Sequence, residues 1–68
     1  MVVKITEREK ELIELLITGK TNKELARDMI VSIHTIKSIL ENLYRKFDVH
    51  NRMQLAIKYL EQVKMNKK

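Results

Sequence analysis

The chain has 68 residues with no cysteine, no proline and one glycine, and it carries a net charge of +5 at pH 7. This length allows one small domain with a modest core, and the lack of cysteine excludes disulfides and thiolate metal sites, which fits a cytoplasmic protein. No stretch approaches the roughly 18 apolar residues of a membrane span, and the scarcity of glycine and proline beside abundant Ile, Leu, Lys and Glu favours helices over strands.

The first predicted helix is marked at both ends. Thr6 and Glu9 have the spacing of a capping box, in which each side chain accepts a hydrogen bond from the other residue's backbone. Leucines then recur at helical spacing until Gly19, a residue type that commonly ends helices. The pattern predicts a helix over about 7–18.

A second capping pattern, Thr21 with Glu24, follows directly. It predicts a short helix over about 22–29. The residues of this helix that we expect to face inward are Leu25, Ala26 and Met29.

Ser32 marks the start of the third predicted helix, over about 33–46, because serine is a preferred N-cap residue. Val31 before it and Ile36 after it are spaced to form a hydrophobic staple, which would fix the angle at which the chain enters the helix. Asp48 tolerates a left-handed backbone and lies in the turn that follows.

The third helix is predicted to have two different faces. At about 100° per residue, its large apolar side chains fall within one arc of roughly 100°, and its polar side chains occupy a similar arc opposite. The apolar arc contains Ile36, Ile39, Leu40, Leu43 and Phe47. The polar arc, which is either a recognition surface or an ordinary solvated face, contains His34, Lys37, Ser38, Glu41 and Arg45.

The fourth predicted helix begins near Asn51, which forms a box-like pattern with Gln54, and extends over about 52–64. The lysine-rich residues 65–68 are expected to fray. These four segments predict an all-α fold.

Apolar side chains of the fourth helix spread over about 200° of its circumference, roughly twice the arc that one core contact needs. Either Val2 and Val3 pack across the surplus, or a second copy of the chain covers it in a symmetric dimer. The residues predicted to meet their copies in that dimer are Met53, Ile57 and Leu60.

Residues 22–39 follow the apolar spacing of a helix-turn-helix, and Ala26 supplies the small side chain needed where the two helix backbones cross closely. In this motif the second helix lies in the DNA major groove. The charge agrees with a polyanionic partner, because residues 32–68 hold eight basic and three acidic side chains, although solubilising charge is the alternative.

Several separate blocks occur in a characteristic order: TERE (6–9), GKTNKELA (19–26), Ser32 with TIK (35–37), KF (46–47) and NR (51–52). Through these blocks the chain resembles the LuxR/GerE family of helix-turn-helix domains over residues 5 to about 60. The resemblance implies that residues 1–68 form a single domain, a four-helix bundle whose third helix recognises DNA and whose fourth helix often mediates dimerisation. The chain departs from the family at Ile39, commonly a histidine, and at Asp48, commonly a glycine.

Base contacts are predicted on the polar arc of the third helix. Lys37 can donate to guanine, Ser38 can donate or accept, and Glu41 can accept from a cytosine amino group. Glu41 could instead pair within the helix with Lys37 or Arg45. His34 could instead be a solvent-exposed histidine without a DNA contact. The candidate base-contact residues are His34, Lys37, Ser38 and Glu41.

Phosphate contacts are predicted first at the start of the helix over 22–29, where free amides, the helix dipole and a lysine suit an anion. Simple capping is the alternative there, and Arg52 could instead be held in an internal ion pair. The candidates at this helix start are Thr21, Asn22 and Lys23, and the family resemblance adds Thr35, Arg45, Lys46 and Arg52.

We therefore expect a transcriptional regulator that binds double-stranded DNA as a homodimer, either free-standing or as the effector domain of a longer protein. The alternative is a helical protein-interaction module of a transcription complex, with RNA polymerase as a candidate partner. The residues offer no nucleophile, base and oxyanion arrangement and no cluster of metal ligands. We accordingly expect no enzyme activity, cofactor, metal, small-molecule ligand or membrane contact.

Overall fold

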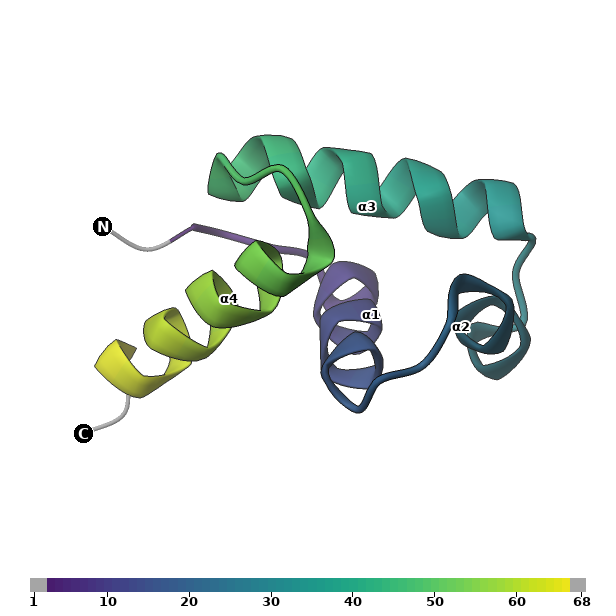
Figure 1. Ribbon diagram of the computed structural model, residues 1–68, viewed down its shortest axis with the longest axis horizontal. Coiled ribbons are helices and arrows are strands. Elements are labelled where there is room, and N and C mark those ends of the chain that lie inside the picture. The colour runs from purple at the N-terminus through teal and green to yellow at the C-terminus, as the bar shows by residue number, and fades with distance from the viewer. Residues whose placement is uncertain (1–2, 67–68) are drawn as a thin grey trace.

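The computed structural model describes residues 3–66, with side chains through residue 64. This range contains four helices: α1 (Glu7–Ile17), α2 (Asn22–Met29), α3 (Ile33–Phe47) and α4 (Arg52–Asn66), and no strand (Figure 1). The predicted all-α fold is confirmed. The four helix starts and the end of α2 are those predicted, whereas α1, α3 and α4 end one or two residues away from the predicted ends. Helix α4 includes residues 65 and 66, which were expected to fray.

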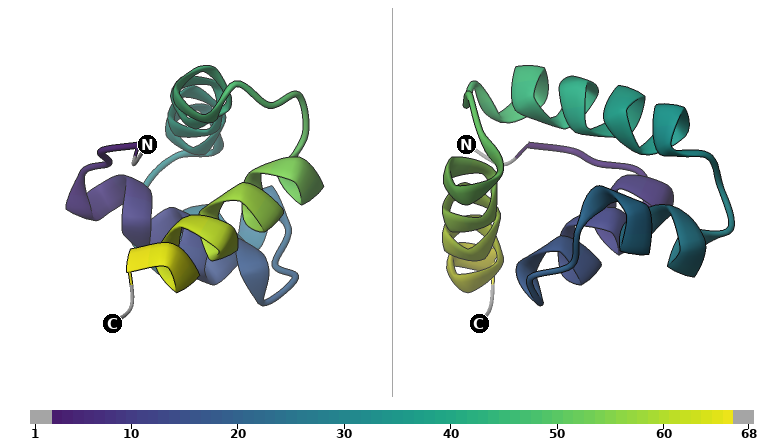
Figure 2. Two further views of the ribbon diagram at one scale, coloured as in Figure 1. Left: turned by 90° about the vertical axis from the view of Figure 1, so that its left-hand side faces the viewer. Right: turned by 45° about the vertical axis from the view of Figure 1, so that its right-hand side comes forward.

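Helix α3 lies across one side of the other helices, with α4 toward one of its ends and α2 toward the other (Figures 1 and 2). Both α1 and α3 contact all three other helices, so these two elements hold the bundle together. The outer side of α3 faces away from the rest of the molecule. The bundle thus displays one long helix on its surface.

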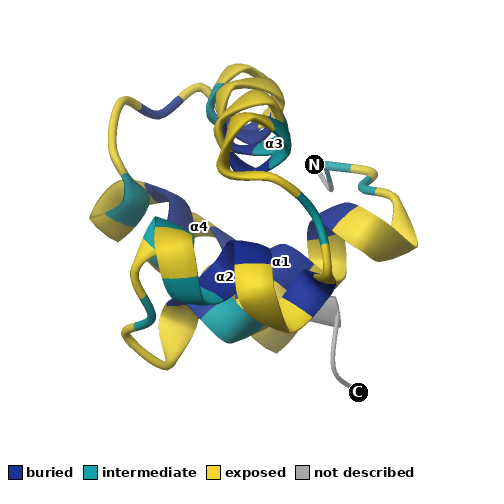
Figure 3. Ribbon diagram, turned by 90° about the vertical axis from the view of Figure 1, so that its right-hand side faces the viewer, coloured by how far each residue is buried: buried dark blue, intermediate teal, exposed yellow. Residues whose placement is uncertain are grey.

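Every helix contributes to one apolar core. The largest side chains with almost no exposure are Leu12, Ile13, Leu25, Ile36, Leu43 and Leu55. The predicted inward residues of α2 are all buried, and so is the side of α3 that faces the bundle (Figure 3). Ala26, buried in α2, is small enough to let α2 and α3 approach closely.

Hydrogen bonds at the helix starts confirm the predicted capping residues. Both boxes are reciprocal: the Glu9 N–H donates to Thr6 Oγ1 at 3.1 Å, the Thr6 N–H donates to Glu9 Oε1 at 2.8 Å, and Thr21 and Glu24 repeat the pair. The Thr35 N–H donates to Ser32 Oγ at 3.1 Å. Local sequence therefore determines where α1, α2 and α3 begin.

The start of α4 differs from the predicted box. Asn51 Oδ1 accepts from the Gln54 N–H at 2.9 Å, as predicted, but Gln54 Oε1 accepts from the His50 N–H at 2.8 Å instead of from the N–H of Asn51. The Gln54 side chain reaches one residue further back than in a capping box. The turn from residue 50 is thereby tied to the first turn of α4.

Two hydrogen bonds join the start of the described chain to α4. The Val3 N–H donates to Gln62 Oε1 at 2.7 Å, and Gln62 Nε2 donates to the Val3 carbonyl at 2.9 Å. Val3 is half-buried and packs against the core, but Met53, Ile57 and Leu60 stay exposed, so Val3 does not cover the surplus apolar face of α4. The other valine considered for this role, Val2, lies outside the described residues.

Candidate nucleic-acid interface

The two predicted faces of α3 are confirmed. The whole polar arc is exposed: His34, Lys37, Ser38, Glu41 and Arg45. On the apolar arc Ile36, Leu40, Leu43 and Phe47 are buried and Ile39 is half-buried. The departure from the family at Ile39 therefore places an apolar side chain against the core.

A shallow hollow lies where α3 meets the starts of α2 and α4. It brings together predicted base contacts (Lys37 and Glu41) and predicted phosphate contacts (Asn22 and Arg52). Tyr44 also lines it, and the sequence reasoning missed this residue. The signal was available, because Tyr44 follows Glu41 by three positions and Lys37 by seven, the spacing of residues on one side of a helix.

Charged groups on the polar arc of α3 are largely unpaired within the described residues. Within the described residues no cationic nitrogen lies within 4.0 Å of the Glu41 carboxylate, so the alternative pairing with Lys37 or Arg45 is not formed. Arg45 Nη1 donates only to Asn42 Oδ1, at 3.4 Å. A carboxylate and two cations on this side are thus available to an external partner.

Arg52 makes internal contacts, but not the ion pair that was considered. Its Nη1 donates to the Lys20 carbonyl at 2.9 Å, and its Nη2 donates to Asn22 Oδ1. Since both acceptors belong to the start of α2 or the loop before it, Arg52 fixes this segment against α4. A guanidinium has five N–H groups, so part of it stays available for another acceptor.

Lys46 is also engaged within the molecule. Its Nζ lies 2.8 Å from Glu9 Oε1, and Glu9 is buried at the start of α1. Burial raises the pKa of the Glu9 carboxyl, but hydrogen bonds from Lys46 and from Thr6 outweigh that effect and hold the pKa below its usual value. Glu9 therefore caps α1 and binds α3 at once, a role that its capping signal alone did not reveal.

The start of α2 combines capping with accessible polar groups. Thr21 and Lys23 are exposed and Asn22 is half-buried. The hydrogen bond from the Thr21 N–H lowers the pKa of Glu24. Beside this helix start, Lys20 is paired with Asp28 at 2.8 Å, which raises the pKa of Lys20. Of the two lysines flanking Thr21 and Asn22, Lys23 is therefore the one free to meet a phosphate.

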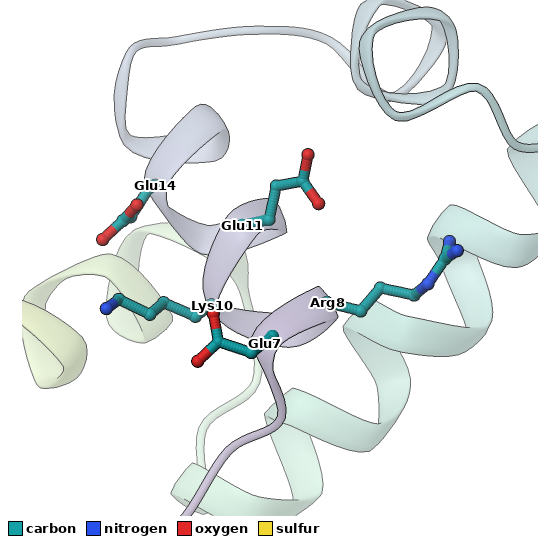
Figure 4. Close-up of a pocket in the computed structure, with 5 residues that line it drawn as sticks. All are labelled: Glu7, Arg8, Lys10, Glu11 and Glu14. Atoms are coloured by element: carbon teal, nitrogen blue, oxygen red, sulfur yellow. The ribbon is translucent and has the colours of Figure 1, made fainter.

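A different charged surface lies on α1. It is lined by Glu7, Arg8, Lys10, Glu11 and Glu14, whose side chains point in different directions and not toward a common point (Figure 4). Glu14 also accepts from the Tyr59 hydroxyl at 3.2 Å, and burial together with this carboxylate raises the pKa of Tyr59. This surface has mixed charge and no convergent groups.

Residues 3–66 contain no group of three or more His, Cys, Asp or Glu side chains placed to hold a metal ion. In the same range no helix combines the length and apolar character needed to cross a membrane.

The model of a family described as bacterial regulatory proteins, luxR family, matches residues 3–59. The chain belongs to the LuxR family. This family comprises regulatory proteins and not enzymes, which confirms the expectation that the chain is not an enzyme. The match covers α1, α2, α3 and the first part of α4, and so includes residues 22–39, the segment predicted to form a helix-turn-helix.

Similar proteins support the same membership. The chain is 36% identical over 56 residues to the spore germination protein GerE of Bacillus subtilis, a match covering 82% of the chain and 76% of GerE. It is 40% identical over 53 residues to the transcriptional regulatory protein LiaR of Bacillus subtilis and 44% identical over 50 residues to the CsgBAC operon transcriptional regulatory protein of Escherichia coli. These matches cover 78% and 74% of the chain but 25% and 23% of the relatives. The chain thus spans about a quarter of these longer LuxR-family proteins.

Proposed function

We propose that this LuxR-family chain binds double-stranded DNA sequence-specifically in the cytoplasm and regulates transcription, with α3 in the major groove. The observation that carries the proposal is the unpaired polar face of α3, displayed beside the capped start of α2. The names of LiaR and the CsgBAC regulator, both transcriptional regulatory proteins, agree with it.

Position along α3 limits which residues read bases. The helix has 15 residues and is about 22 Å long, and in this motif the N-terminal residues are those that reach base edges. The N-terminal half enters the groove in this motif. We therefore assign base contacts to the exposed polar residues His34, Lys37 and Ser38 of this half and to Glu41 just past its end.

Phosphate contacts are assigned around this half. Free amides and an unpaired lysine at the start of α2 favour an anion. The residues assigned there to phosphates of one DNA strand are Thr21, Asn22 and Lys23. Thr35 and Arg45 are added on α3. Arg52 contributes with the donors that it does not use internally, and Lys46 contributes only by leaving Glu9, which gives it a smaller share.

A symmetric dimer through α4 completes the proposal. Met53, Ile57 and Leu60 are 71%, 52% and 50% exposed, and the contact between Val3 and Gln62 leaves them uncovered. A two-fold axis at this face would place two α3 helices on successive major grooves, about 34 Å apart. The bound DNA would then be a two-fold symmetric site.

The test is a selection of bound duplexes from a random pool at moderate salt, followed by affinity measurements at several salt concentrations. Wild type should enrich a two-fold symmetric site. Lys37→Ala should change the preferred bases, at about 1–3 kcal/mol for each lost base contact. Lys23→Ala should weaken binding to all sequences alike and reduce the salt dependence.

Lys10→Ala is the control, because this exposed lysine on α1 is far from the assigned contacts in sequence and its loss changes the net charge equally. No enrichment, together with weak salt dependence, would contradict the proposal. That result would favour a module that binds a protein such as RNA polymerase without reading DNA.

A further inference from the structure

The turn between α2 and α3 carries two exposed isoleucines. Ile30, at the end of α2, is 90% exposed, and Ile33, the first residue of α3, is 42% exposed. Ile30 has the highest exposed fraction among the large hydrophobic side chains of the described residues. Neither side chain belongs to the core, to the polar face of α3 or to the apolar face of α4.

Ile30 is also in an unfavourable backbone conformation. Its φ of 57° and ψ of 51° are left-handed, a region that a β-branched residue rarely occupies because Cβ crowds the following carbonyl. Glycine or asparagine would end the helix here without that cost. A strained backbone and an exposed apolar side chain at one position are typical of a residue kept for a contact.

The position of the turn indicates what that contact is. Ile33 immediately precedes His34, and the N-terminal residues of a recognition helix are those that reach base edges. Ser32, between the two isoleucines, uses its hydroxyl to accept from the Thr35 N–H. The side chains that this end of α3 presents ahead of His34 are therefore mainly apolar.

Two side chains are too few for a protein interface, which needs about 1,000 Å² of buried surface. The apolar group that a major groove offers to such side chains is the C5-methyl of thymine. Building on the proposed function, we propose that Ile30 and Ile33 contact thymine methyl groups at one edge of the half-site. They select thymine beside the positions that His34 and Lys37 read.

The experiment replaces each thymine of the selected site by deoxyuridine, which removes only the methyl group. Wild type should lose affinity about fourfold at one or two positions per half-site, the effect of one buried methyl. This sensitivity should disappear at one position with Ile30→Asn and at another with Ile33→Ala. Asparagine tolerates the left-handed backbone and alanine suits a helix, so both variants keep the fold.

Ile17→Ala is the matched control, because Ile17 is an exposed isoleucine at the end of α1, and its deoxyuridine profile should equal that of wild type. Unchanged sensitivity in both turn variants, or no sensitive thymine in wild type, would overturn the inference while leaving sequence-specific binding intact. Failure of wild type to enrich any duplex would instead overturn the proposed function and this inference with it.

Discussion

A left-handed backbone occurs at two non-glycine residues of the described chain, Ile30 and Asp48. Both are helix C-caps, and their φ values, 57° and 56°, are nearly identical. Aspartate has a short polar side chain that can hydrogen-bond locally in this conformation, whereas isoleucine carries a branched, crowded Cβ. The same geometry therefore costs more free energy at Ile30.

Ile30→Gly should raise the free energy of unfolding by about 1 kcal/mol, because relief of the left-handed strain exceeds the added freedom of the unfolded chain. Asp48→Gly is the matched comparison and should give a smaller gain. Urea unfolding measures the free energy of unfolding of both variants, and its dependence on urea concentration should stay unchanged. Equal gains at the two sites would contradict the assignment of extra strain to the isoleucine.

The sequence predicted both of these turns but the left-handed backbone of only one of them. Asp48 is a residue type that tolerates a left-handed backbone, whereas an isoleucine gives no such signal. The conformation of Ile30 follows from the short distance between α2 and the Ser32 cap of α3, not from its own preference. Tertiary packing overrides the local backbone preference of isoleucine at this position.

At the scale of elements, Glu9 connects the start of α1 with the end of α3. Its pKa is lower in the folded state than the ordinary value of 4.5, so its contribution to stability is present at neutral pH and is lost as the pH falls below that value. The ion pair between Glu9 and Lys46 is therefore one source of acid sensitivity in the fold.

Glu9→Gln should lower the free energy of unfolding by about 1–2 kcal/mol at pH 7, since it removes the charge that Lys46 meets. It should also flatten the stability profile below about pH 4.5. Thermal unfolding across pH measures both effects. Glu24→Gln alters the other capping box, where no cationic nitrogen of the described residues lies within 4.0 Å of the carboxylate. A loss as large as that of Glu9→Gln would show that capping, not the ion pair, dominates.

Arg52 connects the start of α4 with the start of α2 through two acceptors. Arg52→Lys keeps the charge but cannot hold both acceptors in one plane. DNA affinity should therefore fall on every sequence without a change in the preferred site, and thermal stability should fall as well. Arg45→Lys, which loses one long hydrogen bond to Asn42, should leave stability unchanged. Unaltered stability in Arg52→Lys would contradict this positioning role.

The sequence predicted elements better than the contacts between them. Each capping residue lies three residues from its partner, so local spacing was enough to locate the starts of α1, α2 and α3. Lys46 and Glu9 are 37 residues apart, and Arg52 and Asn22 are 30 apart. Such partners depend on how the helices pack, and for that reason three predicted phosphate contacts, Lys46, Arg52 and Asn22, are engaged inside the molecule.

At the scale of the whole molecule, the exposed face of α4 determines the assembly that we propose. Ile57→Gln should weaken self-association about tenfold or more, because in a symmetric dimer each substitution removes two apolar contacts. Sedimentation equilibrium measures the dissociation constant, and binding to a single half-site should be unaffected. Ile17→Gln makes the same change on α1. If Ile57→Gln, Ile17→Gln and wild type had equal dissociation constants, the exposed face of α4 would be excluded as the dimer interface.

The paired hydrogen bonds between Val3 and Gln62 have a mechanical consequence. They span 59 residues of sequence and use both the N–H and the carbonyl of Val3, so this point of the backbone is held to α4 at two atoms. Tension in any polypeptide attached ahead of Val3 reaches α4 without first passing through α1, α2 or α3. A change in the position of such a segment is therefore transmitted directly to the helix that carries Met53, Ile57 and Leu60.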